Sequence, residues 1–136
     1  VQYFIEAPFR LPEAPIVTHV GSATVDGMAY DLVFITWTDV EPQDDVDQYI
    51  AWFEKDSGRL GFLQYTIRDM MGFMEGCMKY EDYRDVDGFW IAHKMTTYDR
   101  PGGEPNLHIF EIQSAKVGAG VPEKTLIPRP DLKGSK

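Results

Sequence analysis

The 136-residue sequence is poor in cysteine, histidine and basic residues, and it has no long apolar run. Its single cysteine, Cys77, excludes an internal disulfide bond, and no second thiol or nearby histidine offers a metal-binding pair. No apolar run approaches the roughly 20 residues of a membrane-spanning helix, so we expect no transmembrane segment. Because 13 basic residues stand against 22 acidic ones, the net charge is −9, which disfavours nucleic acid as a partner.

Motifs that carry chemistry are also scarce. The histidines His19, His93 and His108 show neither HxH nor HExxH spacing. We expect His93 and His108 to lie on adjacent strands, within two or three residues of opposing each other. An enzyme that uses this pair with Glu111 is therefore a minor alternative. The five acids of residues 39–47 lack the glycine-centred pattern of a calcium loop and predict a solvated turn. The sequence thus predicts no catalytic residue, no metal ligand and no cofactor.

The residues that are abundant are apolar and aromatic. Hydrophobic residues make up 43% of the chain and aromatic residues 13%, which is typical of one globular domain with a substantial core. We expect this domain to span residues 1–116. The proline, glycine and basic residues of 117–136 predict an extended C-terminal tail.

Strand signals recur along the domain and are separated by short turns. β-Branched and aromatic segments predict strands at residues 2–5, 16–20, 28–38, 48–54, 59–69, 79–84, 89–98 and 107–116. Asp26-Gly27, Gly58, Asp87-Gly88 and Gly102-Gly103 supply turn chemistry between them. The three prolines of residues 7–15 predict an irregular connection. The sequence therefore predicts a mainly β fold, a curved antiparallel meander in the form of a half-open barrel, with no amphipathic helix to cover it.

Both faces of the predicted strands are apolar. In residues 28–38, Tyr30, Leu32 and Phe34 alternate with Val33, Ile35 and Trp37, so something must cover each side of the sheet. Either both faces are core, or the inner face lines a cavity for an apolar ligand. The candidate ligand-binding residues are Phe34, Trp37, Trp52, Phe62, Tyr65, Trp90 and Met95.

Residues 70–78 hold four of the six methionines. Because methionine is flexible and polarizable, this cluster suits a lid over a cavity or a contact with a partner, and the candidate residues are Met70, Met71, Phe73 and Met74. The alternative is a short helix or a bulged strand that fills the core.

Several short sequence motifs together resemble those of a known family. They are YDLV at 30–33, DQYIAWF at 47–53, YRDVDGFWIAHKM at 83–95, EI at 111–112 and PRP at 128–130. This succession resembles the half-barrel superfamily of bacterial outer-membrane lipoprotein carriers (LolA/LolB-like). The resemblance implies an extracytoplasmic protein, periplasmic or associated with the outer membrane, whose incomplete barrel holds an acyl chain under a helical lid. The N-terminal strands and lid helices of that family have no counterpart here. We therefore expect the C-terminal part of such a domain, or a relative that a partner completes. Because the sequence begins at Val1 rather than Met, we also expect a mature protein that has lost a signal peptide, or a piece of a longer one.

Two functions follow as hypotheses. The first is a non-enzymatic binding protein that holds a lipid or a lipoprotein acyl chain on the concave face of the sheet. The second is a structural subunit of a larger assembly, which would contact other protein chains through the sheet edges and the C-terminal tail.

Overall fold

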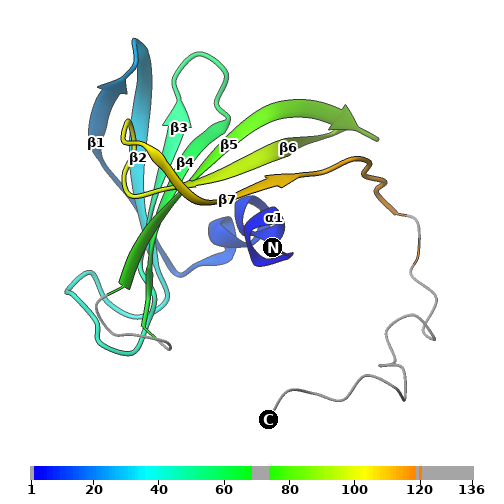
Figure 1. The fold of residues 1–136 in the computed structure, drawn as a ribbon. Helices are drawn as coiled ribbons and strands as arrows, with labels where there is room; N and C mark the ends of the chain where they lie inside the picture. Colours follow the sequence, from blue (N-terminus) through cyan, green and yellow to red (C-terminus); the bar gives the residue numbers. More distant parts are fainter. Residues whose placement is uncertain (1, 69–73, 119, 121–136) are drawn as a thin grey trace.

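The computed structural model describes residues 2–68, 74–118 and 120 (Figure 1). A short helix α1 (Gln2–Arg10) and a 3-10 turn η1 (Leu11–Glu13) precede seven strands. The strands are β1 (Ile16–Val25), β2 (Met28–Thr36), β3 (Tyr49–Glu54), β4 (Leu60–Ile67), β5 (Met74–Val86), β6 (Phe89–Tyr98) and β7 (Pro105–Glu111).

The seven strands form one antiparallel sheet in the order of the chain. Each strand pairs with the next, from β1–β2 through β6–β7, and β1 and β7 are its edges in the described part of the chain. The sheet bends strongly without closing into a barrel, and α1 lies on the inner side of the bend (Figure 1). The predicted mainly β meander is therefore confirmed. No helix within the described ranges is long and apolar enough to cross a membrane.

Two turns have the chemistry that the sequence predicts. Asp26 and Gly27 join β1 to β2 with φ values of 50° and 79°. Asp87 and Gly88 join β5 to β6 with φ values of 53° and 88°. Positive φ at both central residues matches the right-handed twist of the flanking strands, which is why Asp-Gly favours such two-residue hairpins.

The prediction for the N-terminus is wrong, because residues 2–5 are helical and residues 7–10 continue the same helix. Ala7 is buried in the helix, and Leu11 is buried just after it. Phe4 and Ile5 pack against the same core. The spacing of Phe4, Ala7 and Leu11 puts them on one side of the helix, while the polar Gln2, Glu6 and Arg10 lie at i, i+4 intervals on another. The chain therefore does contain an amphipathic helix that covers the sheet. Tertiary packing stabilises it despite the weak helix preference of its residues.

The core has two parts, one on each face of the sheet. The face under α1, called here the helix-covered face, carries the larger cluster. Its buried strand residues are Ile35, Tyr49, Ala51, Leu60, Leu63, Met78, Tyr80, Ala92 and Met95. The opposite face, called here the open face, carries a smaller cluster of Tyr30, Phe62 and Cys77. Apolar residues on both faces of each strand are thus explained mainly as core.

The turn between β6 and β7 packs against the turn between β1 and β2. Gly102 has a φ of +73°, and a Cβ atom there would lie 2.9 Å from Val25 Cγ1. Val25 and Tyr98 in turn pack against the smaller cluster. The bend of the sheet therefore brings its two ends together over this part of the open face.

Candidate functional site

The helix-covered face is built from tyrosines that reach toward α1. Tyr80, from β5, is 3% exposed, and its hydroxyl donates a hydrogen bond to the carbonyl oxygen of Phe4 at 2.9 Å. In a regular helix that carbonyl would accept the N–H of residue 8, but residue 8 is Pro8, which has none. The Tyr80 hydroxyl thus satisfies the carbonyl that Pro8 leaves free, and burial raises the pKa of Tyr80 well above its usual value.

Further aromatic contacts fix the N-terminal end of α1. The hydroxyls of Tyr3 and Tyr49 form a short hydrogen bond. The ring of Phe4 packs on Tyr65 at a centroid distance of 5.1 Å. Burial raises the pKa of Tyr49 and of Tyr65, so these phenols stay neutral at physiological pH. The helix is therefore attached to the sheet by rings and neutral hydroxyls, and no ion pair joins α1 to the sheet in the described residues.

A cavity of about 210 Å³ opens beside this end of the helix. We call it the helix-side cavity, and it is lined by Tyr3, Phe4, Asp47, Tyr65, Thr66 and Ile67. The lining is largely apolar, with Asp47 as its charged member in the described chain. The Asp47 carboxylate accepts the backbone N–H of Arg68 at 2.8 Å. The cavity suits an apolar group whose end is not an anion.

The seven predicted ligand-binding residues do not share one face. Tyr65 and Met95 belong to the helix-covered face. Trp52 and Phe62 lie in the cluster of the open face, where Phe34 lines a separate hollow with Ile50 and Gln64. The last two are largely exposed: Trp37 packs on Tyr49 after the end of β2, and Trp90 lies under the guanidinium of Arg59. Alternation along β4 already separates Phe62 from Tyr65, so the seven residues were never consistent with one face.

The predicted lid residues Met70, Met71 and Phe73 lie outside the described residues, as does the side chain of Met74, which begins β5. Met78, from the same methionine-rich segment, is fully buried in the core. Most of the predicted tail, residues 119 and 121–136, also lies outside the described part.

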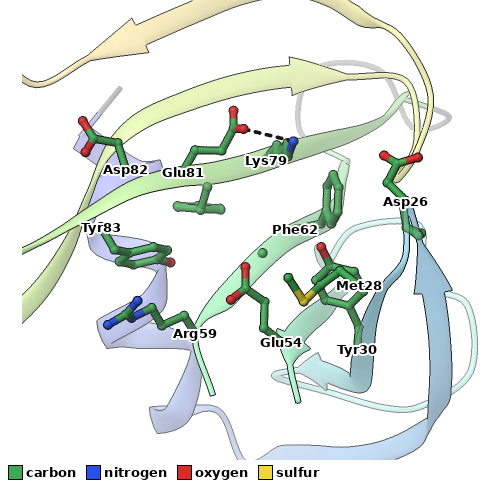
Figure 2. A pocket seen from close by; sticks show the side chains of 13 residues that line it. Asp26, Met28, Tyr30, Glu54, Arg59, Phe62, Lys79, Glu81, Asp82 and Tyr83 are labelled. Atoms are coloured by element: carbon green, nitrogen blue, oxygen red, sulfur yellow. Dashed lines mark ion pairs between the residues drawn. The ribbon is translucent and has the colours of Figure 1, made fainter. Parts of the chain in front are cut away.

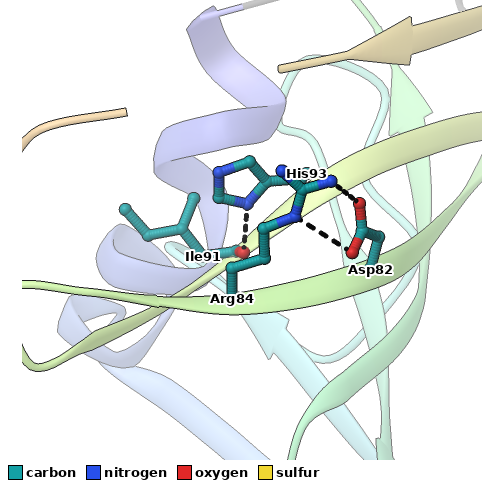
Figure 3. Close-up of polar contacts among 4 residues, drawn as sticks. All are labelled: Asp82, Arg84, Ile91 and His93. Carbon is teal, nitrogen blue, oxygen red and sulfur yellow. Dashed lines mark hydrogen bonds and ion pairs between the residues drawn. The ribbon is translucent and has the colours of Figure 1, made fainter. Parts of the chain in front are cut away.

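The histidines do not come together as expected. The N–H of Ile112 donates to the carbonyl of His93, whereas the N–H of His108 donates to the Thr97 hydroxyl. His108 is thus paired near Thr97, four residues along β6 from His93. His93 Nδ1 donates to the Ile91 carbonyl at 2.9 Å, next to an ion pair between Arg84 and Asp82 (Figure 3). The register of β6 against β7 shifts between Thr96 and Tyr98, and this shift moves His108 away from the position opposite His93.

His93 does share a polar hollow of about 190 Å³ with Glu111. Among the residues that the structure describes, however, no group of three or more His, Cys, Asp or Glu side chains is placed to hold a metal ion.

A larger cavity, of about 410 Å³, lies on the open face (Figure 2). We call it the Tyr30 pocket. Its lining residues are Val25, Asp26, Met28, Tyr30, Glu54, Arg59, Gly61, Phe62, Lys79, Tyr80, Glu81, Asp82 and Tyr83. It combines an aromatic floor with four carboxylates and two cations.

Sequence reasoning missed the residues that matter most in these two cavities. The contact between Phe4 and Tyr80 was missed because residues 2–5 resemble a strand. The one available signal was Pro8, which would leave the Phe4 carbonyl without an N–H partner in a helix. Tyr30 was seen as apolar, but the pocket around it requires Gly61, which comes from two strands away.

Comparison of the chain with known protein families, with curated proteins and with solved structures gave no match.

Proposed function

We propose that the chain is a non-enzymatic protein that binds an apolar ligand, such as a lipid or an acyl chain, between α1 and the sheet. The observation that carries the proposal is the helix-side cavity, an apolar opening of about 210 Å³ where the end of one short helix covers the core. An extracytoplasmic location belongs to the same proposal and rests on the family resemblance.

The energetics of this arrangement favour ligand entry beside the helix. Burial of each ligand methylene contributes about 0.8 kcal/mol, so a chain of four to six carbons would gain roughly 3–5 kcal/mol. The contacts that hold the start of α1 are two hydroxyl hydrogen bonds and ring packing. Each neutral hydrogen bond contributes about 1 kcal/mol net, so ligand burial is comparable to the free energy needed to displace the first turn.

Asp47 refines the choice of ligand. A fatty acid carboxylate that entered with its head at the rim would meet the Asp47 carboxylate, whereas an alcohol or an ester would not. We therefore expect a neutral long-chain alcohol to bind more tightly than the fatty acid of equal length.

The test is titration of the purified chain with the neutral dye Nile red, followed by displacement with decanol or decanoate. Phe4→Ala enlarges the cavity and should increase dye binding, whereas Ile67→Trp fills it and should decrease binding. Leu107→Ala, on the exposed edge strand β7, is the matched control and should change nothing. Equal binding by all four proteins would contradict the proposal.

Native mass spectrometry before and after organic extraction tests the same proposal independently. A lipid-like mass that is released only by denaturation is the expected result. A clean ligand-free mass in every preparation would count against a tightly held ligand.

One observation favours the subunit function as a second candidate. On the edge strand β7, Leu107 is 78% exposed and Ile109 is 62% exposed. An exposed apolar edge strand is a template for pairing with another chain. Sedimentation of the wild type and of Ile109→Lys tests this: an assembly that the substitution dissolves would favour the subunit function, and two identical monomers would exclude pairing through this edge.

A further inference from the structure

The Tyr30 pocket lies on the open face, on the other side of the sheet from the proposed apolar site, and its chemistry is different. Its central feature is the phenol of Tyr30. The residue is only 5% exposed, and its ring packs against Trp52 at 5.9 Å and Phe62 at 5.6 Å. Gly61 makes room for it, because a Cβ atom there would lie 2.6 Å from Tyr30 Cε1.

The hydroxyl of Tyr30 points into the pocket (Figure 2). It has no hydrogen-bond partner among the residues that the structure describes, although the side chain is more than nine-tenths buried. Its oxygen is not fully enclosed but stays open to the cavity, where water can satisfy it until a ligand takes the place of the water. An unpaired phenol that faces an open cavity is therefore available to a ligand.

The charges around the hydroxyl are unevenly paired. Lys79 lies 3.0 Å and Lys94 lies 3.6 Å from the Glu81 carboxylate, so two lysines share this acid. Asp82 is paired with Arg84, outside the pocket lining. Glu54 and Asp26 have no ion pair in the described residues, although Glu54 accepts a hydrogen bond from Ser57 at 2.6 Å.

The other cation of the lining, Arg59, is held on aromatic rings. Its guanidinium carbon lies 4.1 Å from the centroid of the Trp90 ring and 5.7 Å from that of Tyr83. Its charge is thus placed on rings at one end of the pocket. Tyr30 and Glu54 are direct partners in the pairing of β2 with β3, so the two side chains lie beside each other on one face of the sheet, and Asp26 lines the same pocket from the β1–β2 turn.

We propose that the Tyr30 pocket binds an organic ammonium ion. Its N–H groups would donate to the Glu54 carboxylate and to the phenol oxygen of Tyr30, with Asp26 as a second carboxylate. Its methylene groups would lie on the rings of Phe62 and Tyr30, which attract cations through their faces. The chain already places a cation near this floor, since Lys79 Nζ lies 5.9 Å from the Phe62 ring centroid. An anionic ligand would instead meet two unpaired carboxylates.

The experiment is a titration of the ¹⁵N-labelled chain with n-butylammonium at 150 mM salt, which screens nonspecific attraction to the acidic surface. Butanol and butyrate have the same length and serve as neutral and anionic comparators. Saturable shifts of the Glu54, Gly61 and Phe62 amides by butylammonium alone are the expected result. Equal shifts with butanol, or none with butylammonium, would overturn the proposal.

Three variants separate the site from general electrostatics. Glu54→Gln should weaken binding at least tenfold, and Tyr30→Phe, which keeps the ring, at least threefold. Asp56→Asn removes an exposed carboxylate from the same β3–β4 turn and should leave binding unchanged. If Asp56→Asn weakens binding as much as Glu54→Gln does, the pocket is not the site. The amide spectrum of each variant shows that it is folded.

A blocked lysine, Nα-acetyl-lysine amide, distinguishes two sources of the same chemistry. Tighter binding of butylammonium would assign a free amine, and tighter binding of the blocked lysine would assign a peptide side chain. The Tyr30 pocket shares no lining residue with the helix-side cavity. Ile67→Trp should therefore bind butylammonium like the wild type, even if it no longer binds Nile red.

Discussion

The contact between Gly76 and Tyr65 provides a sharp test of how the sheet supports α1. The two residues are direct partners on β5 and β4. A Cβ atom on Gly76 would lie 2.6 Å from Tyr65 Cζ and from its hydroxyl oxygen. The Tyr65 ring thus lies across the glycine, and the same ring contacts Phe4 of α1. Any residue larger than glycine must displace this ring.

We expect Gly76→Ala to lower the free energy of unfolding by about 1–3 kcal/mol, the usual cost of overpacking a core. For a chain of this size the melting temperature should fall by roughly 3–9 °C. Urea unfolding followed by fluorescence measures the effect. Gly120→Ala is the control, because no atom of the described residues lies within 4 Å of its added Cβ atom.

A double-mutant cycle isolates the cause. In the background of Tyr65→Leu the obstructing ring is gone, and Gly76→Ala should be neutral or stabilise by up to about 1 kcal/mol, because alanine restricts the unfolded chain. If Gly76→Ala is harmless in the wild type, or equally costly in both backgrounds, the Tyr65 ring does not lie over Gly76 and the reasoning is refuted.

Three other substitutions test separate parts of the structure. Tyr80→Phe removes the hydrogen bond to Phe4 and should cost about 1 kcal/mol in urea unfolding, with faster hydrogen exchange in α1 than in the strands; unchanged exchange would contradict the role of Tyr80. Gly102→Ala places a Cβ atom 2.9 Å from Val25 at a φ of +73°. We expect it to lower the free energy of unfolding by about 1–3 kcal/mol, measured by thermal unfolding. A stabilised variant would show that the two turns do not touch. Burial raises the pKa of the Cys77 thiol to about 12, so the unfolded chain releases this proton at lower pH than the folded one. Stability should therefore fall as pH rises from about 9 toward 12, and Cys77→Ala should reduce that slope; an identical slope would assign the effect to the buried tyrosines alone.

The strands and their turns were predictable because they depend on local signals. Asp26-Gly27 and Asp87-Gly88 favour positive φ at two successive positions, and few other dipeptides do. β-Branched and aromatic runs between such turns leave an antiparallel meander as the simplest topology. The order of the strands therefore follows from the sequence almost without tertiary information.

The assignment of residues to faces was not predictable, because irregularities in pairing change it. Between Trp52 and Phe53 the register of β3 against β4 shifts by one residue, so Leu60 and Phe62 belong to different clusters. Alternation across an unbroken strand would place them on one face. The grouping of Phe62 with Tyr65 was wrong for a simpler reason, since residues three apart on a regular strand point to opposite faces.

The helix was missed for a related reason, and its Pro8 links local sequence to long-range packing. An interior proline removes an N–H and leaves one carbonyl of the preceding turn without its partner, which in an isolated peptide argues against a helix. Here the carbonyl belongs to Phe4 and is satisfied by Tyr80, 76 residues away. The stability of α1 is therefore coupled to β5. A change that moves Tyr80 leaves the Phe4 carbonyl without a hydrogen-bond partner and destabilises the first turn of the helix. This turn borders the helix-side cavity. The first turn of α1 therefore depends on tyrosines of the sheet as well as on the helix preference of its own residues.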